Sequence, residues 1–319
     1  MTYDKENMIG VLDSFPKQCE DAAKIGRKFK IKGKFESIAV CGMGGSGIGG
    51  DLLKSLVKDI PVYPIHDYNL PKYVNKKSLV ILVSYSGNTE ETISCFKEAK
   101  KKRCRIFSIT SGGKLSELDR NAVIVPKGYQ PRNAIGYLFI TMVSMLSSSR
   151  IIPNQSAAIK ETLGILNPKL CGREGFLLAK RLKDKIPVFY SSEEMAMAAY
   201  RIKTAVNENS KQPAFYHYFP EMNHNEMVGF NKNSARITTV FMIDKKDSRH
   251  IQKRMEITKR LLKEKVDVCE LEVKGKNLLA RMMYSIYVGD YISYYLALMN
   301  REDPTPVLLV EEFKKLLKG

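Results

Sequence analysis

The sequence predicts an α/β protein made of two tandem units, each a parallel β-sheet flanked by helices. Short, continuous apolar segments, such as residues 38–41 and 79–83, alternate with longer segments of helical periodicity. Strands covered by helices on both faces are apolar throughout, whereas half-exposed strands alternate between apolar and polar residues. The alternation starts a second time after residue 150, and a chain of 319 residues is long enough for two domains of about 150 residues each.

The first half of the chain is expected to hold a helical arm and then a complete α/β unit. The arm covers residues 5–30 and is interrupted by Pro16. Strands are expected at residues 38–41, 62–65, 79–83, 105–109 and 122–125. Helices are expected at residues 51–57, 89–102, 115–119 and 134–147.

The second half is expected to repeat the pattern after a connector. Residues 150–170 contain Pro153, Asn154 and Pro168 and are expected to hold one helix, at 157–166. Strands are then expected at 187–190, 237–243 and 266–273, helices at 195–207, 248–264 and 277–298, and a last helix at 309–317. This order predicts an arm at 1–33, a first domain at 34–152, a second domain at 153–300 and a closing tail at 301–319.

Composition excludes several classes of protein. The 44% hydrophobic and 27% charged residues are typical of a chain with a large core, which excludes a disordered protein. The longest uncharged apolar run, residues 135–146, is too short to cross a bilayer, which needs about 20 residues. No apolar leader follows the N-terminus, and the six cysteines form no C-x-x-C pair. A cytoplasmic protein with reduced thiols and no membrane partner is therefore expected.

The chain is strongly basic, with 52 Lys and Arg against 34 Asp and Glu, a formal charge of +18. The densest basic run, residues 97–105, ends an expected helix, where cations also complement the helix dipole. A solvated helix face is the simplest interpretation, and steering of a small anionic substrate is the alternative. No zinc finger or RRM pattern supports a nucleic-acid partner, and none is expected.

A glycine-rich loop follows the first expected strand. Gly42, Gly44 and Gly47 satisfy G-x-G-x-x-G, and His66-Asp67 lies where a dinucleotide site needs an acid. A tight turn built from glycines, or a site for another ligand, explains the pattern equally well. The loop alone leaves these interpretations open.

A hydroxyl-rich loop follows the third expected strand. Ser84, Ser86 and Thr89 bring three hydroxyls to the start of a helix. Hydroxyl groups beside a positive helix end make a site for a phosphate monoester. Helix capping by Asn88 or Thr89 is the alternative, but it accounts for only one of the hydroxyls. The loop therefore predicts phosphate binding.

Residues 44–51 (GGSGIGGD) and 84–92 (SYSGNTEET) resemble the sugar isomerase (SIS) domain, and most closely the bifunctional phosphoglucose/phosphomannose isomerase family. Further matching segments are 130–137, 207–209, 221–226 and 304–307, so the resemblance spans nearly the whole chain. One departure is Met222, where the family leads us to expect Leu.

The resemblance implies two tandem SIS domains, each a flavodoxin-like three-layer sandwich, and a homodimer. It implies an aldose–ketose isomerase, free of metal and cofactor, that interconverts glucose 6-phosphate and mannose 6-phosphate with fructose 6-phosphate through a cis-enediol. In that family the loops hold phosphate rather than a dinucleotide. The implied phosphate ligands are Ser46, Ser84, Ser86 and Thr89, and the implied sugar contacts are Gly44, Gly45 and Thr305.

The resemblance also implies the catalytic residues. Glu208, which its polar neighbours alone would make a surface charge, is implied to be the base that moves the proton between C2 and C1. His224 is implied to open the sugar ring in the active site of the neighbouring subunit. Arg132 begins an expected helix, where a cation is unfavourable unless an anion lies nearby, and is implied to stabilise the enediolate.

Two implied residues lie in the tail. Lys314 is implied to assist at the ring oxygen, and its neighbour Lys315 is so similar that the choice depends on aligning the Phe313-Lys314 pair. Thr305 is implied to leave room for rotation about C2, so that both epimers are accepted.

Two rival interpretations are weighed beside this one. His217, Glu221, His224 and Glu226 could suggest a metal site, but their spacing matches no familiar zinc motif and Pro220 prevents a helix from aligning them. A non-catalytic SIS module that senses a sugar phosphate would need the phosphate loop but not the implied base. An isomerase for another sugar phosphate is a further alternative.

Overall fold

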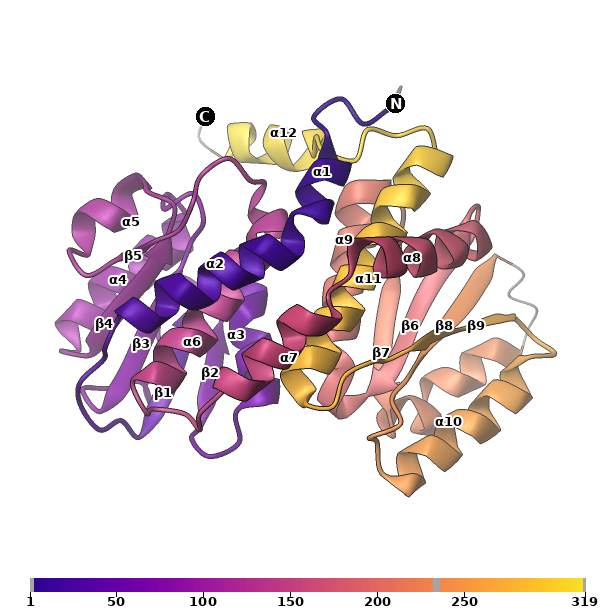
Figure 1. The fold of residues 1–319 in the computed structure, drawn as a ribbon, viewed down its shortest axis with the longest axis horizontal. Coiled ribbons are helices and arrows are strands. Elements are labelled where there is room, and N and C mark those ends of the chain that lie inside the picture. Colours follow the sequence, from indigo (N-terminus) through magenta and orange to yellow (C-terminus); the bar gives the residue numbers. More distant parts are fainter. Residues whose placement is uncertain (1–2, 232–235, 318–319) are drawn as a thin grey trace. The chain divides into compact units, whose positions relative to one another are not determined.

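The computed structural model describes residues 3–231 and 236–317 (Figure 1). The chain divides into two compact units, each described here by itself. The N-terminal unit holds Ser14–Gly164 with Asn277–Ala280, and the C-terminal unit holds Met1–Asp13, Ile165–Lys276 and Arg281–Gly319. None of the described helices is apolar over enough length to cross a lipid bilayer.

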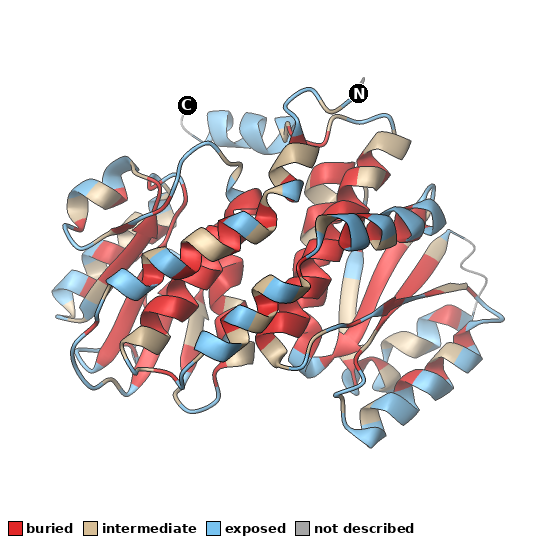
Figure 2. Cartoon of the chain, in the orientation of Figure 1, coloured by how far each residue is buried: buried red, intermediate tan, exposed pale blue. Residues whose placement is uncertain are grey.

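The N-terminal unit is built on a five-stranded parallel sheet. Its strands are β1 (Ser37–Cys41), β2 (Val62–Ile65), β3 (Ser78–Val83), β4 (Arg105–Thr110) and β5 (Val123–Ile124), in the order β2-β1-β3-β4-β5. This is the flavodoxin-like order, in which the carboxyl ends of β1 and β3 flank the switch point where ligands bind. Every residue of β1 and β3 is buried, which explains their unbroken apolar sequences (Figure 2).

Helices cover both faces of this sheet. They are α2 (Phe15–Lys28), α3 (Gly44–Leu56), α4 (Glu90–Lys101), α5 (Gly113–Leu118), α6 (Thr141–Ser148) and α7 (Ser156–Ile165). Ala39 and Cys41 of β1 pack in one core cluster with Phe96 of α4. The alternate residue Val40 faces the opposite helix, where a Cβ added to Gly50 of α3 would lie 2.9 Å from the Val40 Cβ.

The C-terminal unit repeats this arrangement with four parallel strands. They are β6 (Ile186–Ser192), β7 (Phe215–Phe219), β8 (Ile237–Ile243) and β9 (Asp267–Glu272), in the order β7-β6-β8-β9. Its helices are α1 (Met8–Asp13), α8 (Pro168–Leu182), α9 (Ala196–Ser210), α10 (Arg249–Leu262), α11 (Leu278–Met299) and α12 (Leu308–Leu316). The prediction of two parallel sheets flanked by helices is confirmed, and β6 and β8 take the places that β1 and β3 have in the first sheet.

Some predicted elements differ from the structure in extent or in helix type. The helix after β1 begins at Gly44 rather than at residue 51, so the glycine-rich loop is the first part of α3. The arm is interrupted beside Pro16 as predicted: α1 ends at Asp13 and α2 begins at Phe15, with Pro16 in the first turn, where no proline N–H is needed. The helix predicted at 134–147 is a 3-10 turn (Pro131–Ala134), a π-helical turn (Gly136–Ile140) and α6 in succession.

Two elements were not predicted. The helix α8 begins at Pro168, a residue interpreted as part of a connector. The strand β7 has the sequence FYHYF and lies at the edge of its sheet, where Phe215 is exposed. An edge strand of aromatic and histidine residues lacks the aliphatic run by which β1 and β3 were found.

The contact between α2 and α6 is close because Gly26 has no side chain. A Cβ added at Gly26 would lie 2.4 Å from the carbonyl oxygen of Thr141 and 2.8 Å from the Cβ of Ser144. The hydroxyl of Ser144 also donates a hydrogen bond to the carbonyl of Ala23, at 2.8 Å. The α2 part of the predicted arm is therefore an integral part of the N-terminal unit, whereas α1 belongs to the C-terminal unit.

We predict that Gly26→Ala lowers stability by about 1–3 kcal/mol through overpacking, although alanine favours a helix. The matched control is Gly164→Ala in α7, where nothing lies within 4 Å of the added Cβ. There the helix propensity of alanine should raise stability by about 0.5–1 kcal/mol. Denaturant unfolding of both variants checks this, and a stabilised Gly26→Ala protein would contradict the close contact.

Candidate active site

Two loops meet at the carboxyl edge of the N-terminal sheet. The first leads from β1 into α3 and the second leads from β3 into α4. The backbone N–H of Tyr85 in the second loop donates to the Ser46 hydroxyl at the start of α3, at 3.1 Å. The predicted glycine and serine loops are thus joined directly, and Ser46 is buried at the junction.

The hydroxyl groups of the second loop form a connected cluster. The hydroxyls of Ser84 and Thr89 lie 2.8 Å apart, and the N–H of Gly87 donates to Ser84 at 3.1 Å. The N–H of Asn88 donates to the exposed Ser86 hydroxyl at 3.3 Å. Thr89 is the N-cap residue of α4, but its hydroxyl makes no capping bond. The cluster therefore braces the loop while the amides of the first turn of α4 remain open to a ligand.

Arg132 lies against the glycine loop. A Cβ added at Gly45 would come within 2.8 Å of the Arg132 Cα, so only glycine permits this approach. Arg132 itself is 3% exposed. Gln18 of α2 holds the segment, donating to the Asn133 carbonyl at 2.9 Å and accepting from the Tyr137 N–H at 3.0 Å. One face of this unit thus joins seven of the expected site residues: Gly44, Gly45, Ser46, Ser84, Ser86, Thr89 and Arg132.

His66, at the end of β2, occupies the place where a dinucleotide site would need an acid. Its Nδ1 lies 2.7 Å from the Gly42 carbonyl, and its Nε2 lies 3.0 Å from the Asp51 carboxylate. The hydrogen bond with Asp51 raises the pKa of His66. Asp67 accepts a hydrogen bond from the N–H of its neighbour Tyr68. His66 therefore stabilises the glycine loop by hydrogen-bonding to Gly42 and Asp51.

Glu208 lies near the C-terminal end of α9 in the C-terminal unit, half-buried. Lys211 ends this helix in a left-handed conformation, with φ of 55°. Its ammonium group donates to the carbonyls of Glu208, Asn209 and Pro304, at 2.8, 3.2 and 3.3 Å. Lys211 thereby ties Glu208 to the segment that carries the buried Thr305.

A buried polar network fixes the same end of α9 to α11. The Asn209 amide donates to the Ser293 hydroxyl at 2.9 Å, and the Ser210 hydroxyl donates to the Ser293 carbonyl at 2.8 Å. The Asn300 amide donates to the Ser210 carbonyl and to the Gln212 side chain. The sequence analysis did not predict this hydrogen-bond network between α9 and α11. The one pattern that could have indicated it is the cluster of polar residues at 207–212.

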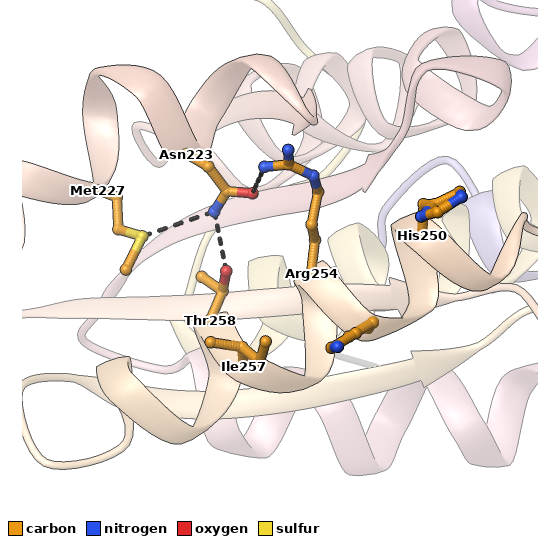
Figure 3. Close-up of a pocket in the computed structure, with 7 residues that line it drawn as sticks. Asn223, Met227, His250, Arg254, Ile257 and Thr258 are labelled. Carbon is orange, nitrogen blue, oxygen red and sulfur yellow. Dashed lines mark hydrogen bonds between the residues drawn. The ribbon is translucent and has the colours of Figure 1, made fainter.

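His224 ends a 3-10 turn, Glu221–His224, that α10 anchors through Asn223 (Figure 3). The Asn223 amide nitrogen donates to the Thr258 hydroxyl at 2.9 Å, and Arg254 donates to the Asn223 oxygen at 3.4 Å. A cavity of about 500 Å³ lies beside this anchor. The neighbouring His224 side chain is exposed, and within the described ranges no hydrogen bond or ion pair involves it.

Lys314 lies on α12, a helix with no buried residue (Figure 2). Its side chain is exposed, as are most apolar side chains of α12. Among the residues that the structure describes, no hydrogen bond or ion pair links Lys314 or His224 to Glu208. Of the four expected site residues in this unit, only Glu208 and Thr305 are thus brought together.

The carboxyl edge of the C-terminal sheet has a different chemistry. Where the first sheet has hydroxyl loops, β8 is followed by the buried Asp244, whose carboxylate lies 2.7 Å from the Arg281 Nε. Arg281 also donates to Glu194 at 2.6 Å, and Asp247 lies beside a cavity of about 260 Å³. Ser192 and Ser248 also line this cavity, but the carboxylates of Glu194 and Asp247 beside them repel a phosphate ester.

The residues of the metal interpretation do not form a metal centre. His217 and Glu226 approach to 3.9 Å, and the hydroxyl of Tyr190 donates to the same carboxylate group. Among residues 3–231 and 236–317, no group of three or more His, Cys, Asp or Glu side chains could hold a metal ion.

The fold and its hydroxyl loops define a double SIS-domain protein. A family profile described as "SIS domain" matches residues 34–150, and one described as "Bacterial phospho-glucose isomerase C-terminal SIS domain" matches residues 173–317. The C-terminal domain of glucosamine-fructose-6-phosphate aminotransferase from Francisella tularensis has the same fold, with a TM-score of 0.76 at 15% identity over 93% of this chain and 97% of that one.

Full-length relatives show the family. The bifunctional phosphoglucose/phosphomannose isomerase of Caldicellulosiruptor bescii is 39% identical over 331 aligned positions, covering 95% of this chain and 97% of its own. The chain belongs to the bifunctional phosphoglucose/phosphomannose isomerase family. A D-glucosamine-6-phosphate 4-epimerase of Sulfolobus acidocaldarius is also similar, at 36% identity over 75% of this chain and 79% of its own.

The acidic edge of the second sheet generates a pH-dependent prediction. Burial raises the pKa of Asp247 to about 6, and the neighbouring carboxylates of Asp244 and Glu194 act in the same direction. A carboxyl whose pKa is higher in the folded than in the unfolded protein destabilises the fold once it ionises. Asp247→Asn should therefore raise stability at about pH 8, and the gain should vanish by about pH 4.

Denaturant midpoints at the two pH values measure this effect. Asp244→Asn is the control, because it removes a carboxylate that pairs with buried Arg281 and should destabilise the protein at about pH 8. If Asp247→Asn changed stability equally at both pH values, ionisation of Asp247 would not be the cause.

Proposed function

We propose that this protein interconverts glucose 6-phosphate and mannose 6-phosphate with fructose 6-phosphate by proton transfer between C2 and C1. Membership of the bifunctional isomerase family supports the reaction. The observation that carries the proposal is the hydroxyl cluster of Ser84 and Thr89, joined through Ser46 to a glycine loop that packs on Arg132. The proposed chemistry moves protons within one sugar and requires neither a metal nor a redox cofactor.

The phosphate ester binds at the hydroxyl loops. Ser46, Ser84, Ser86 and Thr89 supply hydroxyls, and the amides at the start of α4 supply further donors. Gly44 and Gly45 keep the backbone of the first loop bare, so that the sugar can approach it. Because Asn88 N–H and Gly87 N–H already bond the loop hydroxyls, the site is organised before the substrate arrives.

Glu208 acts as the base, and Arg132 stabilises the enediolate. A carboxylate near C1 and C2 takes the proton from one carbon and returns it to the other. The guanidinium of Arg132 is shielded from solvent, so its charge acts strongly on the oxyanions that form in between. The bonds from Lys211 to the Glu208 carbonyl and to Pro304 support a fixed position for the base beside Thr305, where rotation about C2 admits both epimers.

His224 opens the sugar ring from the neighbouring subunit of a homodimer, and Lys314 assists at the ring oxygen. The exposure of both side chains supports a role outside their own unit. The apolar side chains of α12 include Leu309, which is 81% exposed, and such a helix needs a surface to cover it. The cysteines of the described chain are all free thiols, which supports a cytoplasmic location.

A second candidate function is epimerisation at C4 of an amino-sugar phosphate, because one relative is a D-glucosamine-6-phosphate 4-epimerase. A coupled assay that reads fructose 6-phosphate formed from glucose 6-phosphate and from mannose 6-phosphate separates the two. The isomerase must turn over both substrates. A protein that converts neither, yet inverts C4 of glucosamine 6-phosphate, would be the epimerase, and one that only binds would be a sensor.

We predict that Glu208→Gln lowers kcat for both sugars by about 10²- to 10⁴-fold, because the amide cannot accept the C2 proton. Binding of fructose 6-phosphate, measured by calorimetry, should persist because the phosphate loops are untouched. Glu256→Gln, an exposed change on α10, is the control and should leave kcat unchanged. A Glu208→Gln enzyme that kept most of its kcat would remove this residue from the role of base.

We predict that mixing two inactive variants, Glu208→Gln and His224→Ala, restores activity. In a mixed dimer one site receives both mutations, while the other keeps Glu208 of one chain and His224 of its partner. With random reassociation about half of the dimers are mixed, and one of the two sites in each mixed dimer is intact. The mixture should therefore recover about a quarter of wild-type activity on ring-closed substrate. If the mixture stays inactive while each variant still dimerises, His224 acts within its own chain or not at all.

A further inference from the structure

A cavity of about 440 Å³ lies in the N-terminal unit between α2, the end of α6 and the start of α7. It is rich in cationic and hydroxyl side chains: Arg27, Ser144, Ser147, Ser148, Arg150 and Ser156. No Asp or Glu lines it, although the chain has 34 acidic residues. Its size is within the range of small-molecule sites, about 300–1,000 Å³.

The two guanidinium groups of this cavity are available to a ligand. Within the described part of the chain neither Arg27 nor Arg150 has an ion pair or a side-chain hydrogen bond. Helical neighbours could neutralise Arg27 only from positions three or four residues away. Those positions hold Ala23, Lys24, Lys30 and Ile31, so no carboxylate competes for this arginine.

Hydrogen-bond donors converge on the same space. The Ser147 hydroxyl accepts a bond from the Gln155 N–H at 2.8 Å, which leaves its own proton to donate. The ten-residue helix α7 begins at Ser156 and carries no acid in its first turn, so its positive end is not neutralised. Two forked guanidiniums, the Ser147 hydroxyl and a helix N-terminus together are suited to the oxygens of a phosphate group. The Ser144 and Ser148 hydroxyls already donate to backbone carbonyls.

This cavity is separate from the candidate active site. The helical segment that carries Arg132 at its start continues through α6 to Ser147 and Ser148. Fourteen residues at 1.5 Å rise place Ser147 about 20 Å from Asn133 along this segment. A phosphate bound at the hydroxyl loops therefore cannot occupy both places.

We propose that this cavity, Arg27 and Arg150 included, is a second phosphate site that takes a small phosphorylated ligand. Its concave shape favours a small ligand over a macromolecular polyanion, which would lie across an open basic surface. Free inorganic phosphates and the phosphate chain of a nucleotide share the required chemistry. Catalysis at the hydroxyl loops is not needed for this binding, so the proposal stands apart from the proposed function.

The test uses a full-length Ser84→Ala/Ser86→Ala/Thr89→Ala protein, in which the hydroxyl loops are disabled. Calorimetry at physiological ionic strength measures binding of inorganic phosphate, pyrophosphate and ATP to this parent. We expect one equivalent of pyrophosphate to bind. If ATP binds more tightly than pyrophosphate, the ligand of the cavity is a nucleotide. If ATP binds more weakly than pyrophosphate, the ligand is a free inorganic phosphate.

Two double variants of equal charge decide whether the cavity is responsible. Arg27→Gln/Arg150→Gln should weaken pyrophosphate binding about tenfold or more, because two charge-assisted contacts are lost. The control is Lys28→Gln/Arg103→Gln. Lys28 is an exposed neighbour of Arg27 on α2, and Arg103 is an exposed arginine whose φ of 55° matches the 58° of Arg150. Its binding should stay within about twofold of the parent, since only long-range charge is lost.

Equal weakening in the two double variants would show that net charge alone attracts the anion, and would overturn the proposal. So would a parent protein that binds none of the three probes. Arg27 and Arg150 are exposed, so the variants are expected to fold, and thermal melts verify this. Should the double variant unfold, the single variants Arg27→Gln and Arg150→Gln provide the same comparison.

Discussion

The candidate site depends on the hydrogen bond from the Tyr85 N–H to the Ser46 hydroxyl, which joins two loops that follow neighbouring strands. That bond requires α3 to lie unusually close to the sheet. Added side-chain atoms at Gly47 and Gly50 would collide with the Gly42 carbonyl and with Val40. The glycine-rich sequence is therefore a packing requirement, whatever ligand the loop binds. Arg132 enters the site through the same constraint at Gly45.

The two sheets show how one topology can carry different chemistry. Strands β1 and β3 lead into hydroxyl loops, whereas β6 and β8, in the corresponding places, lead into Glu194, Asp244 and Asp247. Arg281 neutralises part of that acidic edge internally. In the C-terminal unit the residue that we propose as the base, Glu208, lies at the far end of a helix, where Lys211 and Ser293 hold the last turn of α9. Tandem domains of one fold can thus carry different chemical groups at corresponding places.

Much of the fold, and the grouping of hydroxyls in the candidate site, could be predicted from the sequence because the informative patterns lie within short segments. The apolar runs of β1 and β3 predicted buried parallel strands, and the spacing of Ser84, Ser86 and Thr89 predicted that their hydroxyls gather at the start of a helix. Phosphate binding by this loop stays a prediction. The missed features depend on partners distant in sequence. The bond from Gln18 to Asn133 and the bond from Asn209 to Ser293 join residues more than eighty positions apart. The contact of His66 with Asp51 spans only 15 positions, but it too was missed, because it exists only once β2 lies beside β1. The roles of Glu208, His224, Arg132 and Lys314 stay predictions of the family resemblance.

The central claim is that a carboxylate moves a proton across C1 and C2 of a sugar held by its phosphate. The most direct measurement is NMR of the sugars after incubation of the wild-type protein with glucose 6-phosphate in heavy water. The account predicts deuterium at C1 of the fructose 6-phosphate formed and at C2 of the glucose 6-phosphate and mannose 6-phosphate that re-form, because the base exchanges its proton with solvent. Conversion that retained every carbon-bound hydrogen, with no deuterium in any of the three sugars, would contradict it.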